Sequence, residues 1–474
     1  MNTDSLKQIF NNKIIIILIF TFLSAVIFAL SLDNGMFWDN VLFASKMGNH
    51  LYNTSLLNWY IPDTYDPGHP PTLGFLLAIL WKIFGHKLWV SHLLMIPFSV
   101  GLLYQIYLLV SFYIKKKLIV FLGLFLIIVD PTLSTQFVIV NPELIQLFFF
   151  FLAINSILYK KSNLKIIALI FLSIISFRSM MLCAGVFLFD FSNSLLINKQ
   201  KLKSILTIKF ITTYLIGSIP ALIYIAWRLI EKGWIQTHPS SPWVNLWHLA
   251  SIKEIIRNII ILGHRYTDFG RIFIYIFIIY NFIKFKNNIF TKNVNQLILL
   301  SITSIITIIV TSILTTNSFG HRYFIVSYIV LTLLAFVILS TFYKRKKIIY
   351  SFLLLSLITG NLWIYPRNIA QGWDATLAHL PYYNLRTEAI NYLDKKSIEI
   401  EDVGTFFPNV TKIDNVDLSG DMRSFTSFNG QNNYLFYSNV YNLSDEEYEI
   451  IDTKYTLVKQ FNKFNIDVNI YKHK

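Results

Sequence analysis

The chain has 474 residues, of which 54% are hydrophobic and only 14% charged, and its mean hydropathy is +0.53. Soluble domains of this size are not so apolar, so the composition predicts a membrane protein with many spans. The net charge of +15 does not indicate nucleic-acid binding, because the basic residues form short clusters between apolar runs, where they set membrane topology. The single cysteine, Cys183, lies in an apolar run and excludes a disulfide framework or a cysteine-based metal site.

A long polar stretch follows the first apolar run. Residues 13–32 are about as long as a membrane span and no small-residue cleavage site follows them, so we predict an uncleaved first helix. The next stretch, residues 32–80, contains four aspartates, two histidines and a Pro-Pro pair, where a connecting loop would be expected to be short. A polar loop of this length favours a functional site over a spacer.

Clusters of lysine and arginine indicate which loops lie in the cytoplasm, because short cytoplasmic loops carry an excess of positive charge. The predicted cytoplasmic clusters are Lys7 and Lys13; Lys115, Lys116 and Lys117; Lys160, Lys161 and Lys165; Lys199, Lys201, Lys203 and Lys209; Lys284, Lys286 and Lys292; and Lys344, Arg345, Lys346 and Lys347. All of these clusters lie on the same side of the membrane only if residues 72–85 do not span it. That segment is shorter than the roughly 20 residues of a span. We predict an interfacial helix on the outer face, anchored by Trp81 and Trp89.

The remaining apolar runs then alternate across the bilayer. About eleven spans are predicted, at 13–32, 88–113, 118–135, 142–159, 166–178, 180–197, 205–230, 269–283, 295–316, 323–343 and 348–364. The N-terminus is expected in the cytoplasm and the C-terminus outside, in a cell membrane such as the inner membrane of a bacterium. The predicted fold class is therefore a mainly α polytopic helix bundle with one interfacial helix.

The composition changes at Tyr365 to mixed charges, Asn, Asp and regular turn signals. Residues 384–394 predict a short amphipathic helix, and residues 434–440 and 455–458 predict strands. We expect two domains: a transmembrane domain, 1–364, and a small external α/β domain, 365–474, which is large enough to fold alone.

This topology gathers the chemically capable side chains on the outer face. They are Asp33, Asp39, Asp63, Asp66, His69, Asp130, Asn141, Glu143, Arg178, His238, His248, His264, Arg265, Asp268, His321 and Arg322. A carboxylate can remove a proton from an acceptor hydroxyl, and guanidinium groups can hold a phosphate leaving group by bidentate hydrogen bonds. The set fits a reaction on an anionic, lipid-linked substrate.

The acidic and histidine residues each have a structural alternative. Asp39 either caps the helix that starts near Val41 or acts in catalysis, and spacing alone does not separate the two. His69-Pro70-Pro71 fits a rigid turn before the interfacial helix, which its composition favours. Glu143 follows Pro142 at a helix start, where an acid is favourable in any case.

The basic residues point more clearly to function. Arg178 lies between two apolar runs, where an unpaired guanidinium is costly, so a functional partner is expected. Arg322, at the outer end of a helix, fits either an interface anchor or a site residue, and we favour the site. The aromatic-rich loop 234–247 fits either a sugar platform or an interfacial belt.

These motifs together resemble a known family. A first helix, an acid in a large outer loop, and His69-Pro70-Pro71 before an apolar helix that ends in Phe84-Gly85 resemble the multispanning GT-C glycosyltransferases. The similarity is greatest to the branch that includes the protein O-mannosyltransferases and the lipid A aminoarabinose transferases. Asn141-Pro142-Glu143, Arg178 and His321-Arg322-Tyr323 fall where that family has an acidic turn, a basic residue and an Arg-Tyr pair. The resemblance covers roughly residues 13–345.

The resemblance implies hexosyl or pentosyl transfer from a polyprenyl-phosphate sugar to a glycan, lipid or protein acceptor at the outer membrane surface, without nucleic acid. It implies that Asp39 is the base or orients the acceptor, and that His69, Arg178 and Arg322 lie near the donor phosphate. The candidates for acceptor or sugar contacts are Glu143, His264, Arg265 and Tyr323. A divalent metal ion is left open, with His69 and Glu143 as its candidate ligands. Asn40 and Asn141 replace residues that are often acidic in the family, which weakens a metal-dependent mechanism.

The working hypothesis is an inverting transfer with Asp39 as base, and alternatives stay open. An oligosaccharide polymerase or ligase would place its key Arg and His residues in one late loop, and residues 231–268 contain such residues. A transporter or flippase of lipid-linked substrates would show ionisable residues at mid-membrane depth and paired repeats, whereas the predicted spans are largely free of acids. An inactive scaffold is also open, because two acidic positions are missing.

Overall fold

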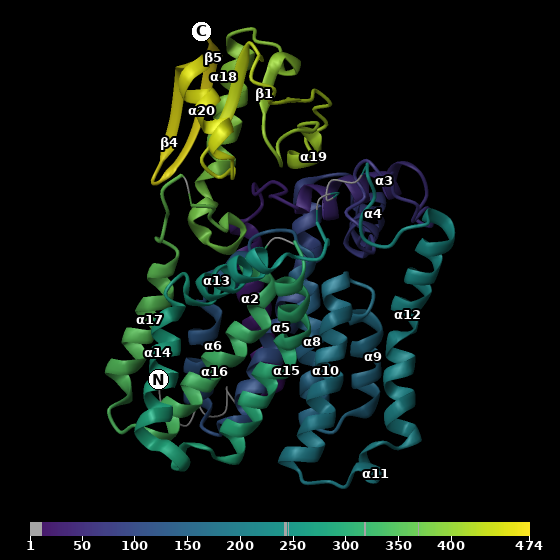
Figure 1. The fold of residues 1–474 in the computed structure, drawn as a ribbon, viewed down its shortest axis with the longest axis vertical. Coiled ribbons are helices and arrows are strands. Elements are labelled where there is room, and N and C mark those ends of the chain that lie inside the picture. The colour runs from purple at the N-terminus through teal and green to yellow at the C-terminus, as the bar shows by residue number, and fades with distance from the viewer. Residues whose placement is uncertain (1–11, 241–243, 245, 317–318, 368) are drawn as a thin grey trace.

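A computed structural model describes residues 12–240, 244, 246–316, 319–367 and 369–474. A helical body forms most of the molecule, and a small mixed domain of strands and helices stands on one end of it (Figure 1). Within the described ranges, seven helical segments are long and apolar enough to cross a membrane. They are α2 (Lys13–Leu30), α5 (Leu88–Tyr113), α10 with the π-helix η2 (Phe177–Ile197), α12 (Ile208–Lys232), α14 with the 3-10 helix η3 (Arg271–Ile289), α15 (Lys292–Leu314), and the 3-10 helix η4 with α16 (His321–Phe342).

Shorter helices complete the body. The apolar ones are α4 (Thr72–Phe84), α6 (Lys117–Ile128), α8 (Pro142–Leu158) and α9 (Ser162–Leu172), and α17 (Lys346–Gly360) runs toward the C-terminal part. The predicted span 118–135 is divided, because α6 ends at Ile128 and α7 (Pro131–Gln136) begins after a break. The carboxylate of Asp130 accepts hydrogen bonds from two backbone N–H groups of α7, and Pro131 occupies its first turn. This cap and proline start a new helix and end the old one.

The two long polar loops of the sequence both contain helices. The first contains the π-helix η1 (Val41–Lys46), α3 (Met47–Asn53) and α4. Both α3 and α4 lie at the end of the body that carries the C-terminal domain (Figure 1). The second, expected as a loop over 231–268, contains α13 (Ile252–Thr267). A Ser251–Glu254 capping box starts this strongly amphipathic helix, which the search for apolar runs does not detect.

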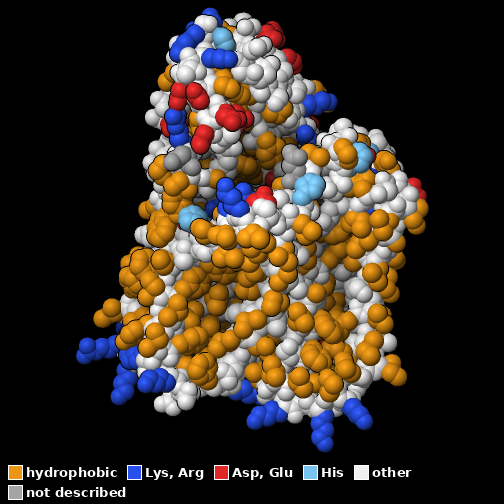
Figure 2. All heavy atoms as spheres, in the orientation of Figure 1, with side chains coloured by type: hydrophobic (Ala, Val, Ile, Leu, Met, Phe, Trp, Pro, Cys, Tyr) orange, Lys and Arg blue, Asp and Glu red, His pale blue; other side chains and the backbone are white. Residues whose placement is uncertain are grey.

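Hydrophobic side chains cover much of the visible face of the helical body, and lysine and arginine side chains gather at the end opposite the C-terminal domain (Figure 2). The short helix α11 (Leu202–Ile205), flanked by lysines, lies at that end (Figure 1). This distribution is typical of a membrane protein with many spans.

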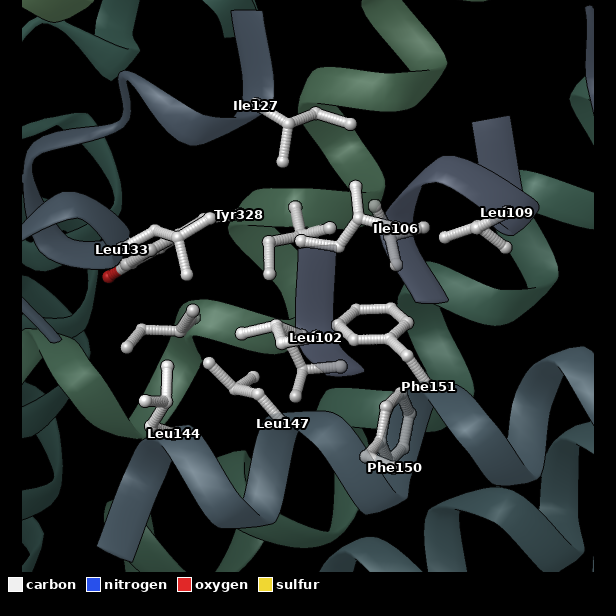
Figure 3. Packing of buried hydrophobic residues seen from close by; sticks show 14 of the residues in the cluster. Leu102, Ile106, Leu109, Ile127, Leu133, Leu144, Leu147, Phe150, Phe151 and Tyr328 are labelled. Carbon is white, nitrogen blue, oxygen red and sulfur yellow. The ribbon is translucent and has the colours of Figure 1, made fainter. Parts of the chain in front are cut away.

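The membrane body has its core around α16. In its apolar window 83% of residues are buried, against 17% for α2, so α16 is central and α2 peripheral. Figure 3 shows how side chains from α5, α6 and α8 interdigitate there, among them Leu102, Ile127 and Phe150. This apolar interior therefore fixes the helices, and with them the polar residues at their ends.

The C-terminal part contains a five-stranded sheet in the order β2-β1-β3-β5-β4. Its elements are α18 (Pro381–Lys395), β1 (Val403–Thr405), α19 (Asp414–Asp417), β2 (Thr426–Ser427), β3 (Tyr434–Ser438), α20 (Asp445–Lys454), β4 (Tyr455–Lys463) and β5 (Ile466–His473). Strands β3, β5 and β4 are antiparallel, and β1 pairs in parallel with β2 and β3. The predicted helix and both predicted strands are confirmed, although β4 is longer than expected.

Each of the two hydrophobic cores contains residues from the other part of the chain. Phe37, from the first loop, lies in the C-terminal core, where its ring stacks on His379 at 4.4 Å. In return, Val416 and Leu418 belong to the core of the membrane body, and the Met36 N–H donates to the Val416 carbonyl at 2.8 Å. The first loop is thus clamped between the two parts of the chain.

Candidate active site

A cavity of about 290 Å³ lies where the first loop, the helix ends and the C-terminal part meet. The molecule is hollowed between the helical body and the C-terminal domain (Figure 2). The residues that line it are Trp38, Asp39, Phe43, Pro67, His69, Arg178, Leu246, Trp247, Arg265, Phe319, Gly320, Arg322, Tyr323, Ala370, Gln371, Gly372, Trp373, Asp374, Phe407 and Asn442. Six of the eight residues that the sequence nominated belong to this lining.

Arg322 is the centre of the charged groups. Its guanidinium pairs with three carboxylates: Nη2 with Asp39, Nε with Glu143 at 3.2 Å, and Nη1 with Asp374 at 2.6 Å. The Arg322 side chain is only 3% exposed, so removing it would leave these acids without their partner, which costs about 3–5 kcal/mol for a buried pair. Arg178 and Arg265 line the same cavity and balance the remaining negative charge.

Asp39 directs its carboxylate into the cavity and does not cap a helix. Asn40 occupies the cap position of η1, and no side-chain hydrogen bond caps that helix. The backbone carbonyl of Asp39 accepts from Leu42 and Phe43, while its side chain pairs with Arg322. The capping alternative for Asp39 is therefore wrong.

Glu143 lies in the first turn of α8, which holds its carboxylate close to Arg322. Asn141 caps that helix by accepting from the Leu144 N–H, and Pro142 occupies the first turn. One carboxylate oxygen of Glu143 meets Arg322, and the other is buried without a hydrogen-bond partner among the described residues. The helix N-terminus favours the negative charge.

Arg178 lines the cavity and is held by an aromatic ring. The carbon of its guanidinium lies 3.2 Å from the centre of the Tyr323 ring, a cation–π contact. Within the described part of the chain, no carboxylate lies within ion-pair distance of it. The capping box of Ser176 and Ser179 fixes the start of α10 and so the direction of this side chain. A guanidinium placed in this way can bind an incoming anion.

His69 is a buried neutral imidazole. Burial lowers its pKa well below the ordinary value, and the positive charges of Arg178, Arg228 and Arg322 add to this effect. Its Nδ1 accepts from the Phe177 N–H at 3.2 Å, so in the neutral ring the proton is on Nε2, which can donate to a ligand oxygen.

The loop that carries His69 is fixed to the C-terminal end of α12. The carboxylate of Asp66 is fully buried and pairs with Arg228 at 3.0 Å and Lys232 at 2.6 Å. It also accepts from the Gly68 N–H at 2.8 Å. A charged network this well satisfied positions the loop rigidly.

Of the three remaining residues proposed from the sequence, two line the cavity and one does not. Arg265, on α13, lines the cavity and donates from Nε to the Phe319 carbonyl at 2.9 Å. Tyr323 lines it beneath Arg178. His264, which precedes Arg265 in the sequence, does not line the cavity, and the centre of its ring lies 5.5 Å from that of Tyr365.

Asp374 is the site residue that the sequence did not nominate. It lies on the 3-10 helix η5 (Trp373–Ala375), and its backbone carbonyl accepts from Gln136 Nε2 at 2.8 Å. Burial raises the pKa of its carboxyl, while Arg322 opposes this shift. A sequence signal exists, because Trp373-Asp374 repeats the Trp38-Asp39 pair.

No metal-binding cluster is present in the described ranges, in which no three His, Cys, Asp or Glu residues are grouped to hold an ion. The two residues nominated as metal ligands, His69 and Glu143, line a cavity of only about 10 Å³ together with Arg178. A neighbouring guanidinium disfavours a cation there. We therefore assign no step to a metal ion.

Two solved structures share this architecture. They are ArnT from Cupriavidus metallidurans bound to undecaprenyl phosphate and the same protein in the apo state. Each has a TM-score of 0.52 over 96% of this chain and 97% of the other, with 11% identity to the first and 10% to the second. Neither a protein-family model nor a curated protein sequence matches the chain. At such low identity the likeness shows the fold alone.

The fold of this chain therefore matches that of ArnT, a GT-C lipid A aminoarabinose transferase, over nearly the full length of both chains. The resemblance stated from the motifs is confirmed at the level of the fold.

Proposed function

We propose that this protein transfers a sugar from a polyprenyl-phosphate donor to an acceptor hydroxyl at the outer face of the membrane. One observation carries the proposal: the unpaired guanidinium of Arg178 and the carboxylate of Asp39 line one cavity in an ArnT-like fold. An anion site beside a proton acceptor is what such a transfer requires. One of the ArnT structures is bound to undecaprenyl phosphate, which supports this class of donor.

Each charged residue then has a role. The acceptor oxygen attacks the anomeric carbon while the bond from that carbon to the phosphate oxygen breaks, and the acceptor proton passes to Asp39. The electron pair of the broken bond leaves with the polyprenyl phosphate, whose negative charge Arg178 stabilises and to which Nε2 of His69 donates. Arg322 is better placed to hold its three carboxylates than to bind phosphate, because all three of its nitrogens already face acids.

The proposed compartment follows from the charge distribution. We assign the lysine-rich end of the body to the cytoplasm and the cavity with the 365–474 domain to the outside, with about eleven spans and an N-terminus in the cytoplasm. Seven segments are long enough to span the membrane, so the remaining spans must come from the shorter helices α4, α6, α8, α9 and α17. On this assignment four of them cross, while α4 lies in the outer interface.

The experiment is a transfer assay with the purified full-length protein and two donors, one with a monophosphate and one with a diphosphate between the polyprenyl chain and the sugar. We expect release of polyprenyl phosphate from the monophosphate donor only. Turnover of the diphosphate donor alone would favour an oligosaccharide polymerase or ligase. Vectorial movement of the lipid without cleavage would favour a flippase.

A further inference from the structure

The cavity wall is unusually aromatic. Seven of the twenty lining residues are Phe, Tyr or Trp, although these residues make up 16% of the chain. Three of them are tryptophans, at positions 38, 247 and 373. Tyr323 makes a cation–π contact with Arg178, whereas none of the three tryptophans makes such a contact with a described Lys or Arg residue. The aromatic faces are therefore available to a part of the substrate that is not anionic.

Two of these tryptophans have a backbone conformation that bulky residues rarely adopt. The φ angle is +50° at Trp38 and +70° at Trp247. For a bulky side chain this region costs of order 1–3 kcal/mol, and it persists mainly at functional sites. In addition, Nε1 of Trp38 is buried without a hydrogen-bond partner among the described residues. Two unfavourable features at one residue indicate that the position of the indole, and not fold stability, is what the chain maintains.

The location of Trp38 assigns the aromatic wall to one of the two substrates. Trp38 immediately precedes Asp39, the proposed proton acceptor, and its ring meets Phe407 of the C-terminal part edge-on at 5.9 Å. A group bound against Trp38 and Phe407 lies next to the carboxylate that removes the acceptor proton. The donor phosphate is expected at Arg178, which stacks on Tyr323. The aromatic pair therefore belongs to the acceptor side.

Polar groups complete the same region. Asn442 lines the cavity and its Nδ2 donates to the Gln371 backbone carbonyl at 3.2 Å, which fixes the amide at the rim. A surface of aromatic faces edged by amide groups is complementary to a sugar ring, which has apolar C–H faces and an equatorial rim of hydroxyls. It is less suited to a phosphate, which needs cations, or to an extended peptide, which needs a row of free backbone partners.

We propose that Trp38 and Phe407 form the acceptor subsite and that the acceptor is a saccharide whose ring stacks on them. The proposal rests on the proposed transferase function and specifies its acceptor class. It also gives the C-terminal part a role, since Phe407 and Asn442 contribute the outer wall. Trp247, in the loop before α13, forms another part of the aromatic wall. The position of Trp247 in the cavity lining supports the interpretation of loop 234–247 as a sugar platform.

Binding of a panel of neutral methyl glycosides to the full-length protein in detergent, measured by saturation-transfer difference NMR, tests this proposal. The variants are Trp38→Leu and Phe407→Leu, with Trp89→Leu as control, because Trp89 is half-exposed on α5 outside the cavity. We expect at least one glycoside to bind the wild type, and each cavity variant to bind it about fivefold more weakly, the loss expected for one aromatic contact. The control is expected to bind like the wild type.

Binding of undecaprenyl phosphate to every variant, measured in parallel, separates the two claims and reports folding. If the wild type binds undecaprenyl phosphate but no glycoside, or if both cavity variants bind glycosides as the wild type does, the acceptor subsite is refuted while the donor proposal stands. A Ser/Thr peptide that binds in place of any glycoside also refutes it. Glycoside binding without undecaprenyl phosphate binding would contradict the transferase proposal instead. If instead Trp38→Leu weakens only donor binding, the aromatic wall holds the donor sugar and the assignment is wrong.

Discussion

Asp374 pairs with Arg322 across the cavity: Nη1 of Arg322 lies 2.6 Å from Oδ2 of Asp374. Arg322 begins the buried helix at the centre of the membrane body, while Asp374 lies beyond the last membrane helix. The same guanidinium holds Asp39 of the first loop, 283 positions away in sequence. The cavity is therefore completed only when the segment after α17 is in place.

The variant Asp374→Asn is expected to lower transfer about 10- to 100-fold, because an amide keeps the shape but removes the charge that pairs with the buried Arg322 guanidinium. Binding of undecaprenyl phosphate should persist, since the donor phosphate is assigned to Arg178. The transfer rate with a polyprenyl-phosphate sugar measures the effect. Asp452→Asn is the matched control, since its pair with Arg367 is about half-exposed. Equal rates for the two variants would argue against a role for Asp374.

Replacing Arg178 by Gln should weaken undecaprenyl phosphate binding about 10- to 100-fold through the loss of a charge-assisted hydrogen bond. Isothermal titration of the purified protein would give the dissociation constants. Arg367→Gln should bind like the wild type, because Arg367 pairs with Asp452 and does not line the cavity. Unchanged affinity in Arg178→Gln would show that the phosphate binds elsewhere.

Gly372 sits where no side chain fits. A Cβ there would lie 2.4 Å from Nδ1 of His321. Gly372→Ala is therefore expected to push the η5 segment, and with it Asp374, away from Arg322 and to reduce transfer more than donor binding. Gly263→Ala on α13 is the control, because a Cβ at that position meets no atom within 4 Å. Similar activity in both variants would mean that the segment adjusts without functional loss.

His379 links the stability of the protein to pH. Burial lowers its pKa from the usual 6.5 to about 4, consistent with a neutral ring that donates from Nδ1 to the Thr376 carbonyl and accepts from the Tyr383 hydroxyl. The folded state binds fewer protons than the unfolded state. Its contribution, on the order of 3 kcal/mol, is thus complete above the unfolded pKa and is lost as the pH falls toward the folded pKa.

Thermal unfolding of the wild type and of His379→Gln, followed from neutral pH down to about pH 4, tests this link. The wild type should lose more of its unfolding temperature across this range than the variant, which cannot be protonated there. Parallel curves would indicate that His379 stays hydrated or changes its contacts.

Much of the site could be predicted from the sequence because charge is costly near a membrane. Arg178 stood out between apolar runs, and His69 and Arg322 were nominated by their motifs; all three line the cavity. Their roles remain predictions. The first loop, in which the sequence predicts a functional site, contributes Asp39 and His69 to the cavity lining.

The remainder depends on contacts that no local pattern encodes. Asp374 was overlooked because the change in composition at Tyr365 suggested a separate domain, although the segment folds back onto Gln136 and Arg322. His264 was nominated beside Arg265, yet the turn of α13 sends adjacent side chains in different directions, and only Arg265 reaches the cavity. In the first loop, a helix start near Val41 and the helix over 72–85 are predicted, whereas the π-helix η1 lacks the 3.6-residue period by which its form could be recognised.

The rate of transfer by Asp39→Asn tests the central claim most directly. Asparagine can still accept a hydrogen bond from Arg322, so the fold and undecaprenyl phosphate binding should be retained, while the proton acceptor is lost. We predict a fall in transfer rate of about 10²- to 10⁴-fold, the usual contribution of a general base, with an unchanged dissociation constant for undecaprenyl phosphate. A variant that transfers sugar at the wild-type rate would contradict the account.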